Sequence, residues 1–304
     1  MFVLALPWII IVLLIISIIF LCRKKWVYSL IIVIICICIN WYSECFPLHF
    51  LAIDELTGRK VVNVMSFNVD GASEDIEGRA PKIIEMVQKY GAEIVFIAEF
   101  SEVKLTYLDS LLTCIYPYST CKGGAAHYFY SKYPLGEQVK IDGGEKKQGI
   151  FRCGVSIGND SIILYGCHLT SNNYTYNMKY ITPDSINNHH DLKIYIKDVK
   201  YAYLQREQQA RTLVKDLADA NKPVIVMGDF NDVGGSNTIR TLENAGLKDA
   251  WWEGGFGYGA TIHKPLPYRI DHIMFSSELR LRNIEVISSN GLSDHDALYA
   301  EIEI

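Results

Sequence analysis

The sequence predicts an α/β (α+β) protein in which an apolar N-terminal segment precedes one large domain. The chain has 304 residues, of which 50% are hydrophobic and 21% are charged, so it can build a sizeable core and is too apolar for disorder. The first fifty residues are almost free of charge. From Val61 onward, short apolar runs alternate with amphipathic segments, which is the pattern of an α/β domain. We therefore divide the chain into an anchor (1–50), a linker (51–60) and a domain (61–304).

The N-terminal segment contains two uncharged runs that are long enough to cross a bilayer as helices. At about 1.5 Å per residue, residues 2–22 reach about 31 Å and residues 26–43 about 27 Å, close to the thickness of a hydrocarbon core. Trp and Tyr flank the second run, as they do at membrane interfaces. No positive charge precedes the first run, which argues against a cleaved signal peptide. Two transmembrane helices are expected, with a buried core hairpin as the alternative.

The basic turn between the two runs predicts their orientation. The positive-inside rule places Arg23, Lys24 and Lys25 in the cytoplasm and sends both termini to the other side. Arg59 and Lys60 follow the second run closely and make this charge asymmetry mild. We expect a multi-pass membrane protein whose domain is extracytoplasmic, either periplasmic or extracellular.

The domain is acidic, which bears on its partners. Of the 29 Lys and Arg and 34 Asp and Glu, the first fifty residues hold only Arg23, Lys24, Lys25 and Glu44, so the remainder carries 26 positive and 33 negative side chains. A balance of −7 lacks the broad basic field that drives non-specific binding to duplex nucleic acid. Charge alone therefore does not favour nucleic acid, although a local basic groove would permit it.

The cysteines argue against a structural zinc site. The eight Cys show no CxxC pair and no Cys/His spacing typical of zinc. The four in the domain are compatible with disulfides in an oxidising compartment or with buried thiols in a reducing one. We expect buried thiols at Cys114, Cys121, Cys153 and Cys167.

The domain begins with a strand–helix–strand unit. Residues 61–67 and 94–98 are continuous apolar runs, which are typical of buried strands. Between them lies an apolar stripe at helical spacing that ends before Gly91, a residue type that commonly follows a helix. The stripe consists of Ala80, Ile83, Ile84 and Val87.

The remaining domain is rich in strands. Residues 151–157 and 162–166 flank a turn at 158–160 and predict a hairpin, and a long helix ending near Ala220 leads into a buried strand at 223–227. The last residues alternate, which predicts a half-buried strand. Its apolar face is Leu298, Ala300, Ile302 and Ile304, and its polar face is Glu301 and Glu303. Many strands and few helices predict stacked sheets.

One long connection, residues 171–200, is rich in Asn and Tyr and interrupted by Pro183. An irregular connection of this length in a compact domain is usually functional or mobile. We expect it to lie at the edge of the active site because it follows His168 in the chain.

Polar side chains follow the apolar strands where ligands bind in α/β sheets. They are Asn68 and Asp70 after the first strand, Glu99 after the second, His168 after the hairpin, and Asp229 and Asn231 after residues 223–227. Further candidates near the C-terminus are Arg269, Asp271, Asp294 and His295. No GxSxG elbow, Walker loop or nucleophilic Cys context accompanies them. Carboxylates, amides and imidazoles of this kind suit a metal-assisted attack by water on a phosphate ester.

A hard cation is the expected cofactor. Mg²⁺ needs one or two carboxylates and keeps positions open for substrate oxygens, and Glu99, Asp70 and Asp294 offer such carboxylates. Mn²⁺ and Ca²⁺ are the alternatives. The amides of Asn68 and Asn231 can donate to phosphoryl oxygens. Arg269 is the arginine that we expect to meet the phosphate.

Individually, these residues have plainer interpretations. Asn68 and Asp70 before Gly71 could form an ordinary turn, and Glu99 could cap a helix that begins near Ser101. His272 is expected to be a structural neighbour of Asp271, so it is left out of the site together with the two histidines at 189–190.

Six motifs, in the order in which they occur, resemble the endonuclease/exonuclease/phosphatase superfamily. The resemblance covers nearly all of residues 61–304. The motifs are Ser66-Phe67-Asn68-Val69-Asp70-Gly71, Ala98-Glu99, Gly166-Cys167-His168-Leu169, Gly228-Asp229-Phe230-Asn231-Asp232, Arg269-Ile270-Asp271-His272-Ile273 and Ser293-Asp294-His295. The resemblance implies a four-layered sandwich of two mixed β-sheets flanked by helices.

The resemblance also implies roles for the site residues. Glu99 would be the principal metal ligand, with Asn68 and Asp70 beside it, and Asp294 the carboxylate of a second metal position. The proton-handling residues would be His295, oriented by Asp271, and His168 at the leaving oxygen, while Asp229 and Asn231 would position water and the phosphoryl group.

Two positions depart from the family pattern. Ala98 stands where the family usually has Gln, and His168 stands where abasic-site endonucleases carry Tyr. The second departure points to the deoxyribonuclease, sphingomyelinase and phosphatase branches.

The expected function is hydrolysis of a phosphodiester or phosphomonoester by a membrane-anchored, divalent-metal-dependent enzyme. The alternatives are a phospholipid phosphodiesterase of the sphingomyelinase type and a catalytically silent interaction domain. The expected partners are a phosphate-ester substrate, either nucleic acid or phospholipid, and the bilayer through residues 2–43. No obligate protein partner is inferred.

Overall fold

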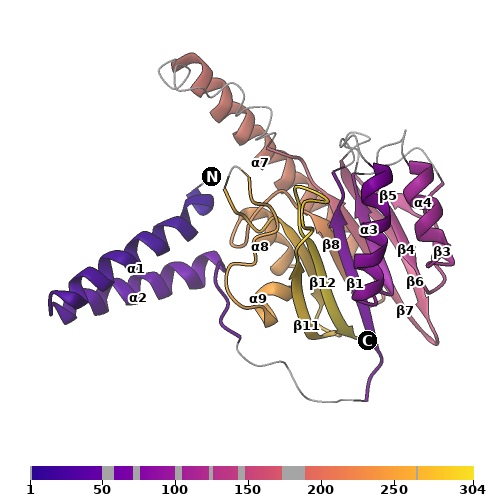
Figure 1. Ribbon diagram of the computed structural model, residues 1–304, viewed down its shortest axis with the longest axis horizontal. Coiled ribbons are helices and arrows are strands. Elements are labelled where there is room, and N and C mark those ends of the chain that lie inside the picture. The colour runs from indigo at the N-terminus through magenta and orange to yellow at the C-terminus, as the bar shows by residue number, and fades with distance from the viewer. Residues whose placement is uncertain are drawn as a thin grey trace.

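The computed structural model describes residues 2–49, 58–70, 76–99, 105–122, 126–142, 148–172, 189–264 and 266–304. Two β-sheets pack face to face, helices cover their outer faces, and an apolar helix hairpin projects from one side (Figure 1). The chain therefore forms the expected four-layered sandwich of two mixed sheets. Most of the predicted linker, 51–57, and residues 173–188 of the Asn/Tyr-rich connection lie outside the described residues.

The first sheet has the strand order β11-β12-β1-β2-β4-β3. β1 runs parallel to β2, whereas the other neighbours are antiparallel. Helices α3 and α4 pack on its outer face. The bounds are β1 Val61–Asn68, α3 Ile76–Lys89, β2 Ile94–Ala98, α4 Leu105–Thr113, β3 Tyr118–Ser119, β4 Tyr128–Ser131, β11 Arg280–Ile287 and β12 Ala297–Glu303.

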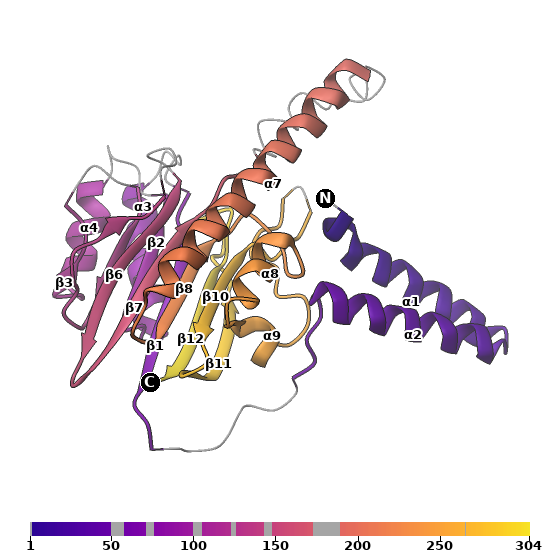
Figure 2. The same cartoon turned by 180° about the vertical axis from the view of Figure 1, so that it is seen from behind.

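The second sheet has the order β5-β6-β7-β8-β10-β9, and its central pair, β7 and β8, is again parallel. The long helix α7 and the short α8 cover its outer face (Figure 2). The bounds are β5 Val139–Lys140, β6 Gly149–Ile157, β7 Asp160–His168, α7 His189–Ala218, β8 Val224–Asp229, α8 Asn237–Glu243, β9 Leu247–Asp249, α9 Ala250–Gly254 and β10 Asp271–Ser276.

The main core lies between the two sheets. Phe96 and Leu298 of the first sheet and Met227 and Ile273 of the second are completely buried there. The sheets approach so closely that a Cβ on Gly166 would lie 2.1 Å from the Phe96 ring, so only glycine fits at that position of β7. Because both sheets are held from inside, the ends of β1, β2, β7 and β8 are fixed relative to one another.

Several predicted elements are confirmed, and two details differ. The runs at 61–67 and 94–98 are β1 and β2, and the predicted hairpin is β6 and β7. The final strand has buried residues on both faces. On the face that was expected to meet solvent, Tyr299 packs with the core beneath α3, Glu301 is partly exposed, and Glu303 is 1% exposed and pairs with Arg282 at 3.0 Å. The connection at 171–200 is not irregular throughout, since α7 already begins at His189.

The domain cysteines also differ in part from expectation. All eight cysteines are described, and each is a free thiol. Cys153 and Cys167 are buried as expected, whereas Cys114 is exposed and Cys121 is partly exposed.

The N-terminal hairpin consists of α1 (Leu6–Cys22), after a short 3-10 turn at Phe2–Ala5, and α2 (Trp26–Ser43). The helices pack on each other through Ser17 and Ser29, whose hydroxyl oxygens are 2.8 Å apart. Most of their other side chains are exposed, with Ile18 at 59% and Trp41 at 77%. This exposure excludes a buried core hairpin. Both helices are long and apolar enough to cross a membrane.

The segment that follows α2, residues 40–49, lies against the domain. Arg240 of α8 donates to the carbonyl of Tyr42 at 2.6 Å and lies 4.0 Å above the Tyr42 ring. Farther on, the Gly257 N–H donates to the carbonyl of Pro47 at 2.9 Å, and His49 lies 3.0 Å from the carbonyl of Trp252. The hairpin is thus joined to the domain by packed contacts.

Candidate active site

The strand registers bring the predicted site residues together. In the first sheet, Asn68 pairs with Ala98, so Glu99 leaves the sheet beside Asn68. In the second sheet, Asp229 pairs with His168 on one side and with Asp271 on the other. Since the two sheets pack face to face, both sets of strand ends open on the same edge of the sandwich.

Asn68 connects the two sheets. Its Nδ2 donates to Glu99 Oε1 at 3.0 Å and to Asp229 Oδ2 at 3.1 Å. Its Oδ1 accepts the backbone N–H of Asp70 at 3.1 Å. A 1%-exposed amide with these partners fixes the carboxylates of Glu99 and Asp229 relative to each other.

His168 lies beside both of these carboxylates. Its Nε2 is 3.3 Å from Glu99 Oε1 and 3.9 Å from Asp229 Oδ2. Burial and the neighbouring charge of Asp271 raise the pKa of Asp229, while the imidazoles of His295 and His168 oppose this shift.

Asp271 and His295 form a buried dyad. Asp271 Oδ2 lies 2.8 Å from His295 Nδ1, and Nε2 of the same ring is 3.7 Å from Asp229 Oδ2. Burial lowers the pKa of His295, but the negative charges of Asp271 and Asp229 outweigh it and raise the pKa to about 10. Asp229 Oδ2 therefore lies within 4 Å of two imidazole Nε2 atoms, one from His168 and one from His295.

The backbone around the site is unusual. Asp70, Glu99 and Asn231 have φ values of 46°, 59° and 52°, in the left-handed region that residues other than glycine rarely occupy. Such conformations cluster at functional sites, because surrounding contacts must hold them. Asn231 is held on both sides, since its N–H donates to Asp229 Oδ1 at 2.8 Å and its Nδ2 donates to the carbonyl of Leu169 at 3.0 Å.

A similar steric demand explains Gly228, which precedes Asp229. Its φ is 143°, and a Cβ there would lie 1.9 Å from the carbonyl oxygen of Cys167 on the neighbouring strand. Only glycine allows β7 and β8 to approach this closely.

The geometry agrees with comparisons to known proteins. Residues 65–295 match the model of the endonuclease/exonuclease/phosphatase family. The chain belongs to this family. A comparison with curated proteins found no match.

Solved structures of low sequence identity share the fold. Humanized D. rerio TDP2 is 18% identical, with a TM-score of 0.60 over 80% of this chain and 99% of that chain. C. elegans TDP2 is 19% identical, with a TM-score of 0.57 over 83% and 77%. Beta toxin from Staphylococcus aureus is 17% identical, with a TM-score of 0.55 over 79% and 99%. The family is one of phosphoester hydrolases, and this fold is common to all three.

The structure places the remaining predicted residues as follows. Asp70 sits in the turn directly after Asn68. Asp294 is exposed beside His295, with its Oδ1 3.4 Å from the hydroxyl of Ser293. Both carboxylates therefore lie at the rim of the buried group.

Arg269 differs from the prediction. It is 3% exposed, and its Nη1 donates to Asp249 Oδ2 at 2.8 Å, an oxygen that also lies 2.8 Å from His272 Nδ1. Burial opposes the ionisation of Asp249, but Arg269 and His272 outweigh it and hold the pKa of this carboxyl well below its ordinary value. The structure thus places Arg269 in a buried ion pair with Asp249 through Nη1. His272 is structural as expected, but its partner is Asp249.

The donor set fits a divalent cation. Among the described residues, two groups have ligand atoms within 4.8 Å of one another, and they share Asp229: Glu99, His168 and Asp229, and Asp229, Asp271 and His295. Glu99 has a partly exposed side chain, at 37%, so its carboxylate remains accessible. Asp271 Oδ1 is buried without a hydrogen-bond partner among the described residues. Family enzymes of this kind typically use divalent metals, and a site rich in carboxylate oxygens suits them.

One residue of the site was missed by the sequence prediction. His127, which is completely buried, accepts the backbone N–H of Glu99 on Nδ1 at 3.4 Å. Its ring meets the His168 ring edge-on, with centroids 5.0 Å apart, and also contacts Phe151 at 5.0 Å. No motif marks His127, because it precedes a strand that carries none of the other site residues. Only its position beside Glu99 and His168 in space identifies it.

Proposed function

We propose that this protein is a membrane-anchored, divalent-metal-dependent phosphoesterase that uses water as the nucleophile. The observation that carries the proposal is the convergence of Asn68, Glu99, His168, Asp229 and the Asp271–His295 dyad at one edge of the sandwich. These contacts join six residues that are widely separated in the sequence. No simple structural demand calls for three buried or partly buried carboxylates beside two imidazoles.

Glu99 would hold the cation, assisted by Asn68 and Asp70, with Asp294 available for a second ion. We propose Mg²⁺, with Mn²⁺ or Ca²⁺ as alternatives. When bound, such an ion neutralises the negative charge that develops on the phosphoryl oxygens. Asn68, which already fixes Glu99 at 3.0 Å, would keep the ligand carboxylate in place.

The chain's own residues would handle the protons. Displacement at phosphorus needs one group that takes a proton from water and another that protonates or stabilises the leaving oxygen. His295 and His168 are suited to these tasks because their Nε2 atoms lie 3.7 Å and 3.9 Å from the same oxygen, Asp229 Oδ2. Asp271 orients the His295 ring through Nδ1 and stabilises its protonated form. Asp229 and Asn231 would position the water and the phosphoryl group.

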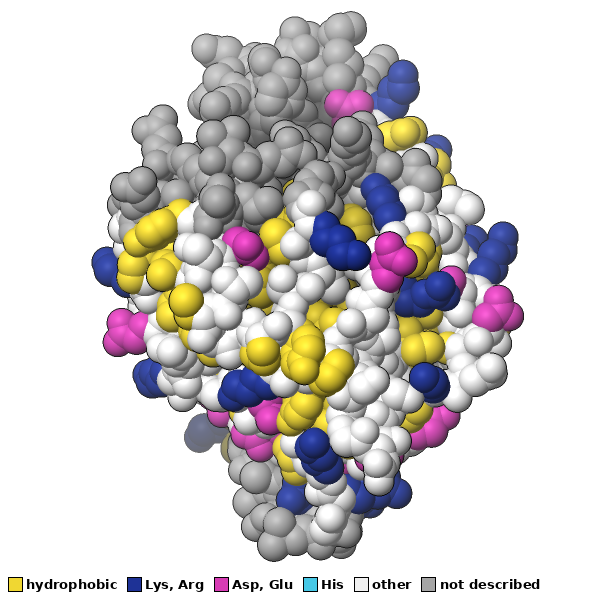
Figure 3. Space-filling model, turned by 90° about the vertical axis from the view of Figure 1, so that its right-hand side faces the viewer, with side chains coloured by type: hydrophobic (Ala, Val, Ile, Leu, Met, Phe, Trp, Pro, Cys, Tyr) yellow, Lys and Arg dark blue, Asp and Glu magenta, His cyan; other side chains and the backbone are white. Residues whose placement is uncertain are grey.

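A phospholipid phosphodiesterase is the second candidate. It is favoured by the apolar hairpin, which packs on the domain and would hold the site near a membrane. On the described part of the face away from the hairpin, Lys and Arg side chains are scattered among acidic and apolar ones (Figure 3). A nucleic-acid substrate is the competing outcome, and one related fold, D. rerio TDP2, was solved with a single-strand DNA product.

The test is an activity panel with the full-length protein in detergent or vesicles. The substrates are DNA, RNA, sphingomyelin and phosphoinositides, each assayed with Mg²⁺ and with excess chelator. Glu99→Gln keeps the shape of the side chain but removes its charge, so we expect turnover to fall by about 10² or more, as when electrostatic stabilisation is removed from a site. Glu207→Gln, which alters a partly exposed carboxylate of α7 that pairs with Arg211, is the matched control and should retain turnover. Full activity in chelator, or of Glu99→Gln, would contradict the proposal.

A further inference from the structure

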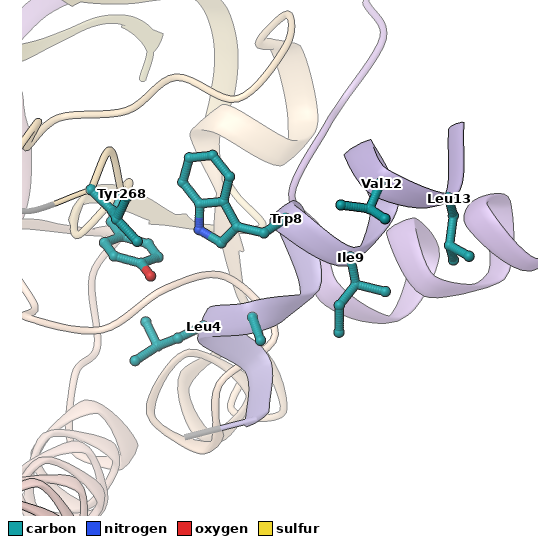
Figure 4. Close-up of a pocket in the computed structure, with 8 residues that line it drawn as sticks. Leu4, Trp8, Ile9, Val12, Leu13 and Tyr268 are labelled. Carbon is teal, nitrogen blue, oxygen red and sulfur yellow. The ribbon is translucent and has the colours of Figure 1, made fainter. Parts of the chain in front are cut away.

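An apolar pocket of about 530 Å³ lies where the first turns of α1 meet the loop that precedes β10. Figure 4 shows Trp8, Ile9 and Val12 of the helix on one side and Tyr268 of the loop on the other. Its volume is in the range of small-molecule sites. Among the described residues, its walls carry no charged side chain; they are Leu4, Ala5, Trp8, Ile9, Val12, Leu13, Leu266 and Tyr268.

The pocket is continuous with the lipid-facing side of the hairpin. Val12, which lines it, is 54% exposed, and Ile15 and Ile18 along the same helix are 54% and 59% exposed. In a bilayer these side chains would contact hydrocarbon. Leu266, on the domain side of the pocket, is also 46% exposed, so the apolar exposed surface extends from the helix onto the loop.

Trp8 adds a polar feature to this apolar wall. Its ring meets the Tyr268 ring edge-on at 6.5 Å, and its Nε1 is buried with no hydrogen-bond partner among the described residues. An indole with an unsatisfied N–H beside an apolar groove matches the ester region of a lipid, where carbonyl oxygens border the acyl chains. A purely apolar occupant would leave this donor unpaired.

The pocket wall is connected to the active site through the same loop. Tyr268 and Ile262 exchange two backbone hydrogen bonds, at 2.9 Å and 3.0 Å, and Ile262 is bridged to His295. A ligand that packs against Tyr268 therefore supports the strand-like segment that holds His295.

We infer that this pocket binds one acyl chain of a membrane glycerophospholipid, with an ester carbonyl near Trp8. The inference rests on the proposed membrane anchoring. It assigns to the α1–domain junction a lipid site that is separate from the catalytic edge, and it makes the lipid part of the support for the Ile262–His295 segment.

The test uses the full-length protein in phosphatidylcholine vesicles that contain a phosphatidylcholine with a photoreactive diazirine in one acyl chain. After illumination, mass spectrometry maps the adducts. We expect adducts on α1, on α2 and on the peptide that carries Leu266 and Tyr268. Ile9→Trp fills the pocket and should lower the loop adducts by about tenfold, because overpacking excludes the ligand. Leu266→Gln, at an exposed loop position, is a second variant that should lower the adducts at Tyr268.

The control is Ile34→Trp, an equally bulky change at a 51%-exposed position on α2, which should leave the loop adducts unchanged. Adducts on both helices but none on the loop would overturn the lipid site while leaving the membrane anchor intact. Absence of adducts from both helices would instead overturn the anchor. Equal loop labelling in Ile9→Trp, Leu266→Gln and the control, or cross-linking of Leu266 to a second copy of the chain, would also overturn the inference.

Discussion

Replacing Asp271 by Asn tests the dyad most directly, because the change removes one charge and almost no volume. Asp271 is 1% exposed and lies 2.8 Å from His295 Nδ1. At an effective dielectric constant of about 20, unit charges about 4 Å apart interact by about 4 kcal/mol. This equals about three pKa units. Asp271 acts together with Asp229 against the effect of burial, and the pKa of His295 is raised to about 10, so Asp271→Asn should lower this pKa toward its ordinary value while the charge of Asp229 remains.

The catalytic consequence follows from the same contact. Without Asp271, the imidazolium loses its stabilising charge, and an amide at this position can impose the other tautomer. We expect kcat to fall by about 10² to 10⁴. The assay is turnover of a soluble chromogenic phosphodiester at saturating Mg²⁺. Asp216→Asn, which alters a carboxylate paired with Arg152 and Tyr165 and not with any site residue, is the matched control. Activity of Asp271→Asn within about threefold of wild type would refute the assigned role.

The same variant changes how stability depends on pH. His295 has a raised pKa in the folded protein, so its protonation stabilises the fold fully below about pH 6.5, the unfolded value, and this contribution is lost as the pH rises through about 10. Thermal melts in chelator should show the wild type losing stability over this interval. Asp271→Asn should lose less over the same interval. Parallel curves would contradict the coupling between Asp271 and His295.

Three further predictions concern other parts of the molecule. His127→Phe removes the acceptor for the Glu99 N–H and should raise the half-saturating Mg²⁺ concentration by about 10- to 100-fold. His127→Asn retains an acceptor and should recover part of the Mg²⁺ affinity. If both variants and the wild type gave the same Mg²⁺ titration, His127 would not be a positioning residue. Arg269→Met should lower the free energy of unfolding in urea by about 3–5 kcal/mol, because Asp249 loses its buried partner. A raised KM without loss of stability would instead support a phosphate-binding role for Arg269. Reporters fused at residues 24 and 304 should lie on opposite sides of the membrane, with residue 304 extracytoplasmic; a cytoplasmic C-terminus would contradict this topology.

The sequence was sufficient for those parts of the fold and site that local pattern determines. β1 and β2 are continuous apolar runs because both of their faces are covered, and Asn68, Glu99, His168 and Asp229 follow strands whose ends the registers align. The helix hairpin was predictable because few structures other than a membrane-spanning or buried helix accommodate a long uncharged run.

The parts that could not be predicted depend on partners distant in the sequence. Arg269 stands two residues from Asp271, which made a site role plausible, yet its partner is Asp249, twenty residues away and on the next strand. Glu303 alternates like a solvent-facing residue, but Arg282 on the neighbouring strand pairs with it, and the carboxylate is buried. His127 belongs to the site only because β4 lies next to β2 in the sheet. In each case the sheet order, and not the local sequence, decides the environment.

The contacts of residues 40–49 have a consequence for how far the enzyme can reach. The chain attaches to the domain through Tyr42, Pro47 and His49 before it enters the linker, so residues 51–57 do not set the separation between bilayer and catalytic centre. If α1 and α2 span the membrane as proposed, the centre is mounted at one height and in one orientation. The catalytic centre then reaches only phosphoester bonds that lie at that distance from the bilayer. A domain on a flexible tether would instead reach bonds over a range of distances. Lengthening the linker would leave this working distance unchanged, whereas loosening the Arg240–Tyr42 contact would change it.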